Sequence, residues 1–218
     1  MEIVSRSQWG ARPPRATTAL VPSQVRGIAV HYTAMDADRV HDHAGCAARV
    51  RGIQRFHMDT RSWNDIAYSW LVCQHGYVFE GRGWGVRTAA NGTNDGNNGY
   101  HAVCFLGGDT DRDDVTAAGR DALGRVLRAA PGGDVKPHSF FTTTTCPGDE
   151  LRAYVEAEGW RVVKPWPVPL PAWTWLWMSW KLRGSPRGER PPSAPWFIPP
   201  WAWLRLAALK KARSGSSG

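Results

Sequence analysis

The sequence predicts an α/β fold for residues 1–163, followed by a short Trp-rich helical appendage. Before residue 164, short apolar runs alternate with amphipathic helical patterns, which is typical of a sheet covered by helices. Apolar residues make up 42% of the chain, enough for a buried core and too many for wholesale disorder. Near residue 164 the composition changes, because proline and tryptophan become frequent.

Four short apolar runs predict β-strands, at residues 27–32, 66–72, 77–80 and 100–106. The first run delivers His31 at its end. The second and third are joined by a predicted turn over residues 74–76, which ends in glycine.

Three segments predict helices, at residues 42–58, 116–129 and 147–158. The second of these places Leu123, Val126 and Leu127 on one side. The third begins with Pro147, which the first turn of a helix tolerates. Residues 91–99 are turn-forming throughout and predict a long polar loop without secondary structure.

The C-terminal quarter predicts three segments: a stiff Pro-rich linker at 164–172, a basic Trp-rich two-helix region at 173–212 and a disordered tail at 213–218. Eight of the 13 tryptophans lie beyond residue 164. Residues 170–176 and 198–204 share an apolar-Pro-x-Trp-x-Trp-Leu pattern, which is a two-copy internal repeat.

Positive charge is concentrated in this quarter, since residues 161–218 hold ten Lys or Arg against a single acidic residue, Glu189. Three interpretations remain open for 173–212. It could anchor the protein to a cell wall by stacking on sugars and binding anionic wall polymers, lie at the headgroups of envelope lipid, or pack as a helical hairpin on the main domain. Nucleic-acid motifs are lacking, so we expect no nucleic-acid partner. We expect a monomer.

Two imidazoles and one thiolate, His31, His138 and Cys146, are a plausible zinc ligand set, with one tetrahedral position left for water. On spacing alone, a core cysteine and two surface histidines explain the same residues. The even count of four cysteines does not indicate disulfides, because the spacing is not that of a small disulfide-rich fold.

Five sequence motifs are Ser7–Ala11, Ala29–Thr33, Arg51–Met58, Trp63–Val72 and Val78–Trp84. They occur in the order found in peptidoglycan recognition proteins, a family related to phage N-acetylmuramoyl-L-alanine amidases. The sequence resembles that family from about residue 5 to 158. The resemblance implies a central mixed β-sheet flanked by α-helices, with a substrate groove over one Zn²⁺ ion held by His31, His138 and Cys146.

The resemblance also implies catalytic roles for Tyr68 and Thr144, whose hydroxyl groups would donate hydrogen bonds to the oxyanion that develops during amide hydrolysis. The family's disulfide beside the groove would use Cys46, but no cysteine stands near His41 to pair with it. We therefore expect Cys46, and likewise Cys73 and Cys104, to be buried thiols.

The stretch that includes His57, Arg61, Ser62 and Trp63 aligns with family residues that contact the peptidoglycan stem peptide. Arg61 is suited to pair with a peptide carboxylate. Ser62-Trp63 stands where relatives that bind diaminopimelate carry Gly-Trp, so the resemblance favours a diaminopimelate stem. Simple packing at a helix–strand corner would also explain Trp63.

The resemblance implies zinc-dependent hydrolysis of the amide between N-acetylmuramic acid and L-alanine in bacterial peptidoglycan. The alternative is a recognition module that binds peptidoglycan without cutting it; in this family, loss of a ligand marks such members. High Arg, Ala, Gly and Pro usage suggests a GC-rich actinobacterial or actinophage source. The N-terminus has no signal-peptide pattern, which the role of a phage endolysin would explain. Such a protein would be made in the host cytoplasm and act at the cell wall after release.

Overall fold

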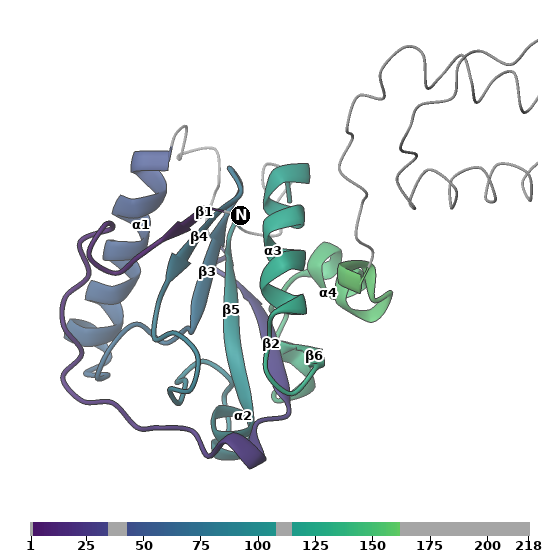
Figure 1. Cartoon of the computed structure of the whole chain (residues 1–218), viewed down its shortest axis with the longest axis horizontal. Helices are drawn as coiled ribbons and strands as arrows, with labels where there is room; N and C mark the ends of the chain where they lie inside the picture. Colours follow the sequence, from purple (N-terminus) through teal and green to yellow (C-terminus); the bar gives the residue numbers. More distant parts are fainter. Residues whose placement is uncertain (1, 35–42, 108–114, 162–218) are drawn as a thin grey trace, which may run out of the picture. The chain divides into compact units, whose positions relative to one another are not determined.

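A six-stranded mixed β-sheet with helices on both faces forms the centre of the computed structural model (Figure 1). This confirms the expected fold class. The structure describes residues 2–34, 43–107 and 115–161. The chain divides into two units, Met1–Val163 and Lys164–Gly218, and the linker, two-helix region and tail expected in the second lie outside the described residues. Within the described part, no helix has the length and apolarity needed to cross a membrane.

The strands follow the sheet order β1-β4-β3-β5-β2-β6. Their bounds are Glu2–Val4 (β1), Gly27–Tyr32 (β2), Trp70–Cys73 (β3), Tyr77–Glu80 (β4), Tyr100–Leu106 (β5) and Asp134–Pro137 (β6). Only β3 and β4 pair antiparallel, and the other neighbouring strands run parallel. The predicted turn between β3 and β4 is present, closed by a hydrogen bond from the Gly76 amide to the Cys73 carbonyl.

The predicted strand 66–72 was placed too early, because it begins at Trp70. The Ile66 amide donates to the Asp65 carboxylate and the Ala67 amide donates to Nδ1 of His57. Side chains therefore take the amide groups that a strand ladder would need.

The α-helices among the described residues are α1 (His43–Arg55), α2 (Asn94–Gly99), α3 (Ala117–Arg128) and α4 (Asp149–Glu156). A π-helical turn at Phe56–Thr60 continues α1. Helix α2 corrects the prediction of a loop without secondary structure at 91–99. The Thr93 side chain caps α2 by accepting a hydrogen bond from the Gly96 amide, and this local bond offsets the poor helix propensity of the segment. Helix α4 starts at Asp149 rather than Pro147, because Gly148 has a φ of 83°, outside the helical region.

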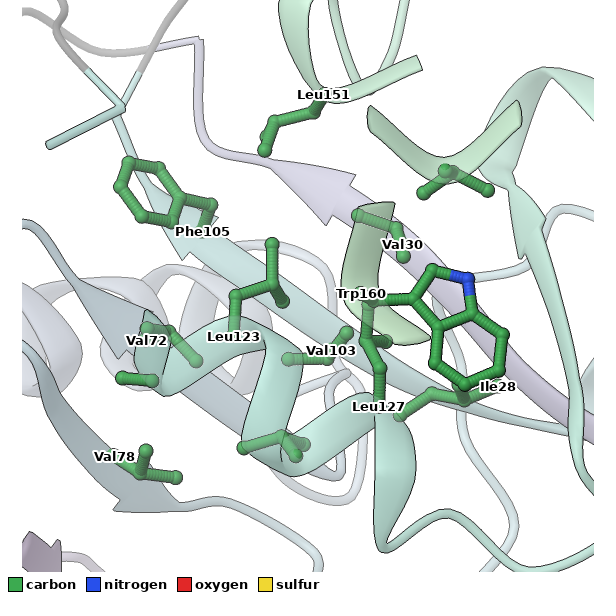
Figure 2. Packing of buried hydrophobic residues seen from close by; sticks show 13 residues of the cluster. Ile28, Val30, Val72, Val78, Val103, Phe105, Leu123, Leu127, Leu151 and Trp160 are labelled. Carbon is green, nitrogen blue, oxygen red and sulfur yellow. The ribbon is translucent and has the colours of Figure 1, made fainter. Parts of the chain in front are cut away.

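Two apolar clusters cover the two faces of the sheet. On one face, Ile28, Val103, Leu123 and Leu127 pack with Trp160 (Figure 2). The predicted apolar side of the second helix, in α3, is confirmed by the burial of its three residues. On the opposite face, α1 buries Cys46 and Val50 against alternate residues of β3, β4 and β5. Figure 1 shows α1 and α3 on opposite sides of the sheet.

Alternation along β2 decides where His31 points. Ile28 and Val30 belong to the cluster under α3, so His31, one residue further, faces the side of α1. The close pairing of β2 with β6 depends on Gly27, since a Cβ there would lie 1.9 Å from the Asp134 carbonyl oxygen.

Candidate active site

His31 and His138 are brought together by the parallel pairing of β2 and β6. The register pairs Val30 with Pro137, so the next residue of each chain segment is a histidine. Both strands therefore deliver a histidine at their carboxyl ends, and the imidazole centroids lie 4.3 Å apart. The sequence analysis did not predict that these two histidines are neighbours on adjacent strands, because it did not identify β6 as a strand.

Cys146 completes the set from the loop that follows β6. Its Sγ lies 3.8 Å from Nδ1 of His31 and accepts a hydrogen bond from the Tyr32 amide at 3.4 Å. One ligand atom each from His31, His138 and Cys146 lies within 4.8 Å of the other two. The three residues proposed as ligands from the sequence are thus neighbours in the structure.

Asn91 fixes which nitrogen of His31 faces the cluster. Nε2 of His31 lies 2.9 Å from Oδ1 of Asn91, while the Asn91 amide nitrogen donates to the carbonyl oxygens of Gly96 and Tyr100. These two bonds orient the amide so that its oxygen accepts from Nε2–H of His31. Nδ1 of His31 then presents a lone pair toward Cys146, as a metal ligand must.

The donor set fits a zinc ion. Both ring nitrogens of His138 are buried without a hydrogen-bond partner in the described part of the chain, an arrangement that costs free energy unless a ligand satisfies them. Burial lowers the pKa of His138, and burial together with nearby His138 lowers the pKa of His31 to about 3. Both imidazoles are therefore neutral at pH 7, and neutral imidazoles with a thiolate are typical zinc ligands.

Tyr68 lies between the ligand cluster and a groove. Its ring is 5.5 Å from that of His31, centroid to centroid, and it also lines a hollow of about 480 Å³ beside α1. Burial, with smaller contributions from Cys104 and Cys146, raises the pKa of Tyr68 well above its usual value. The hydroxyl group therefore stays protonated and can donate a hydrogen bond. Tyr68 precedes β3 rather than lying within it.

Thr144 lies two residues before Cys146 and contacts it. Its hydroxyl oxygen accepts a hydrogen bond from the Cys146 amide at 3.2 Å, which helps to hold the thiol in place. The hydroxyl proton remains available for donation to a second acceptor.

The substrate residues expected from the sequence fall into two neighbouring regions. His57 lines the hollow beside α1 together with Tyr68, Arg49, Ile53 and other residues. Ser62 and Trp63 line a second hollow of about 390 Å³. The stacked rings of His57 and Trp63, with centroids 4.9 Å apart, connect the two regions.

Arg61 is exposed and lies over the Phe56 ring, with its guanidinium carbon 5.4 Å from the centroid. It is not among the residues that line either hollow. Ser62 has a φ of 56°, in the left-handed region that glycine adopts most readily. The chain turns sharply there and directs Trp63 back toward His57.

Cys46, Cys73 and Cys104 are buried, and no disulfide joins any of the four described cysteines, as predicted. Asn91 is the main residue of the site that the sequence analysis did not find. The available indication was a polar side chain, but it lies in a segment that was predicted to be a loop.

Residues 21–149 match the family described as Amidase_2, N-acetylmuramoyl-L-alanine amidase. The chain belongs to this amidase family. An N-acetylmuramoyl-L-alanine amidase of pig (Sus scrofa) is 36% identical over 153 residues, a match that covers 67% of this chain and 25% of the pig protein. A Homo sapiens protein of the same name is 34% identical over 161 residues, a match that covers 67% of this chain and 26% of the human protein. The match thus spans about a quarter of the length of these two relatives.

The chain is also similar to peptidoglycan recognition proteins (PGRPs). Peptidoglycan-recognition protein SC2 of Drosophila simulans is 31% identical over 170 residues, covering 75% of this chain and 85% of that protein. A mutant of Drosophila PGRP-LB solved with tracheal cytotoxin superposes with a TM-score of 0.63 at 25% identity, covering 71% of this chain and 93% of that one. PGRP-LE, solved with the same diaminopimelic acid-type fragment, gives a TM-score of 0.61 at 28% identity, covering 71% and 92%.

Proposed function

We propose that this chain is a zinc-dependent N-acetylmuramoyl-L-alanine amidase that hydrolyses the amide between N-acetylmuramic acid and L-alanine in bacterial peptidoglycan. Family membership supports the substrate class. The single observation that favours an enzyme over a recognition module is the converging set of His31, His138 and Cys146, with Asn91 orienting His31 and Tyr68 beside it.

Each residue of the site has a distinct part in this proposal. His31, His138 and Cys146 would hold zinc, which when bound polarises a carbonyl group and lowers the pKa of bound water to about 7. Tyr68, protonated and facing both groove and ligands, would donate a hydrogen bond to the oxygen that gains negative charge in the transition state. Thr144 would position Cys146 and can donate to the same oxygen.

The groove beside α1 suits a peptide. It combines an apolar wall, formed by Ile53 and Phe56, with the polar groups of Arg49 and His57. We propose that the stem peptide lies here and continues toward Trp63, and that the third residue of the stem is diaminopimelate. Two structural relatives at 25% and 28% identity were solved with a diaminopimelic acid-type fragment, which supports this choice.

The decisive experiment measures newly exposed L-alanine amino groups after incubation with peptidoglycan. We expect release by the zinc-loaded protein, none after removal of metal by a chelator, and recovery when zinc is restored. Binding of peptidoglycan by the zinc-loaded protein without release would instead identify a recognition module. Release that is unchanged by metal removal would exclude the zinc mechanism. Comparing diaminopimelate-type with lysine-type muropeptides tests the stem preference.

The biological setting is proposed as host lysis by a phage endolysin, in which the basic Trp-rich region at 173–212 binds the wall. The concentration of tryptophan and positive charge there supports an affinity for anionic wall polymers. Deleting residues 164–218 should then reduce sedimentation with intact cell walls while leaving hydrolysis of soluble muropeptides unchanged. Undiminished wall binding would reject the anchor.

A further inference from the structure

A second cluster of metal-binding side chains shares no residue with the candidate active site. Cys46, Cys73 and His75 place one ligand atom each within 4.8 Å of one another. The two cysteines are buried and His75 is half-buried. The proposed hydrolysis uses none of the three.

Three different elements bring these side chains together. Cys46 comes from α1, Cys73 is the last residue of β3, and His75 lies in the turn to β4. The hydrogen bond that closes this turn and the left-handed φ of 85° at Gly76 fix the short Cys-x-His segment at the end of the hairpin. Cys46 and Cys73 belong to the same buried cluster, so α1 packs its thiol directly over the hairpin.

The distances are those of a metal site that needs little rearrangement. Sγ of Cys46 lies 3.3 Å from Nδ1 of His75. With Zn–S of about 2.3 Å and Zn–N of about 2.0 Å, a tetrahedral site separates sulfur and nitrogen ligands by about 3.5 Å.

We propose that Cys46, Cys73 and His75 bind a second soft divalent cation, of the class of Zn²⁺, which fastens α1 to the β3–β4 hairpin. Two thiolates and an imidazole select such an ion over Mg²⁺ or Ca²⁺. Three protein ligands leave one tetrahedral position for water. Because Arg49 and Ile53 of α1 line the groove beside that helix, the ion would also fix one wall of the groove.

The test counts zinc per full-length chain by elemental analysis, after purification under reductant, exposure to zinc and removal of loosely bound ion. We expect two ions in the wild type, one in Cys146→Ala and one in His75→Ala. The matched control, Cys104→Ala, removes a buried thiol outside both clusters and should keep two. A zinc content in His75→Ala equal to that of the wild type, or no zinc in Cys146→Ala, overturns the proposal.

A second measurement, the rate of cysteine alkylation, uses a protein in which Cys46, Cys73 and His75 are all unchanged. In Cys146→Ala, zinc should slow alkylation of Cys46 and Cys73 relative to Cys104, and a chelator should restore the rate, as located by peptide mass mapping. Equal alkylation with and without zinc contradicts the proposal. A Cys46–Cys73 disulfide in the reduced, zinc-exposed protein does so as well. Neither readout involves hydrolysis, so the outcome is separate from that of the proposed function.

Discussion

The side-chain oxygen of Asn91 lies 2.9 Å from Nε2 of His31, while the Asn91 amide nitrogen donates to the carbonyl oxygens of Gly96 in α2 and of Tyr100 at the start of β5. The amide cannot rotate without breaking both bonds. Asn91 therefore determines the tautomer of a candidate zinc ligand that lies 60 residues away in the sequence.

Asn91→Ala should weaken zinc binding at the active site by about 10- to 100-fold, because His31 loses the acceptor that orients its ring. The measurement is competition for zinc against a chelating dye. Asn98→Ala, which removes an exposed amide bonded to Arg87, is the control and should bind zinc like the wild type. Wild-type affinity in Asn91→Ala would show that the hydrogen bond does not orient the ligand.

Zinc binding at the active site should release about one proton at pH 7.5. Burial raises the pKa of Cys146 to about 11, so the metal-free thiol is protonated, whereas His31 is already neutral. Calorimetric titrations in buffers of different ionisation enthalpy give the number of protons. The relevant binding step is the one that disappears in Cys146→Ala. Heats independent of the buffer for that step would contradict this expectation.

Tyr68→Phe should lower kcat by about 10²- to 10³-fold, with little change in KM or zinc content, because the lost hydrogen bond forms in the transition state. Tyr154→Phe removes a hydroxyl that contacts the Arg120 carbonyl on the α3 side and is the matched control. An unchanged kcat in Tyr68→Phe would show that Tyr68 is not a catalytic residue.

Acid should destabilise the metal-free protein as the pH falls below 6.5. Burial is the main cause that lowers the pKa of His57 from 6.5 to about 4. Between these values the unfolded chain binds a proton that the folded chain does not, so stability is full above pH 6.5 and declines as the pH falls toward 4. For His57 the loss reaches about 3 kcal/mol.

Urea denaturation of wild type and His57→Gln at pH 7 and pH 4.5 isolates this contribution. The variant should lose less stability between the two pH values than the wild type, since glutamine does not titrate. If wild type and variant lost the same stability between pH 7 and pH 4.5, His57 would take up its proton equally well in the folded and the unfolded protein.

Gly27→Ala should destabilise the protein by about 1–3 kcal/mol and weaken zinc binding as well. The new methyl group would overlap the Asp134 carbonyl and push β6, which carries His138, away from β2. Gly52→Ala in α1 meets only the flexible end of Arg55 and should stabilise the fold by about 0.5–1 kcal/mol. Thermal unfolding measures both, and a Gly27→Ala protein as stable as the wild type would refute the close-contact argument.

The strands found from the sequence are those with uninterrupted apolar runs, such as the one ending at Tyr32. Strand β1 escaped prediction because it has only three residues, and β6 because its sequence, Asp-Val-Lys-Pro, contains no apolar run. Both are held by pairing with distant strands rather than by their own composition. Asn91 escaped for a related reason, since α2 depends on the Thr93 cap, a hydrogen bond that hydrophobic periodicity does not reveal.

The candidate ligands were found in the sequence by residue type and by resemblance to a family. Their convergence required β6, because only the pairing of Val30 with Pro137 places His31 beside His138. Local patterns could not supply that contact, which joins segments more than one hundred residues apart.

Strand β6 is the last described strand along the chain, which gives the candidate metal site a place in the order of assembly. A chain emerging from the ribosome has His31 early, but His138 and Cys146 follow only after the other five strands have been made. Under the proposed function, zinc binding by all three ligands therefore requires the described sheet to be complete, and we expect a truncated chain that lacks β6 to hydrolyse no peptidoglycan.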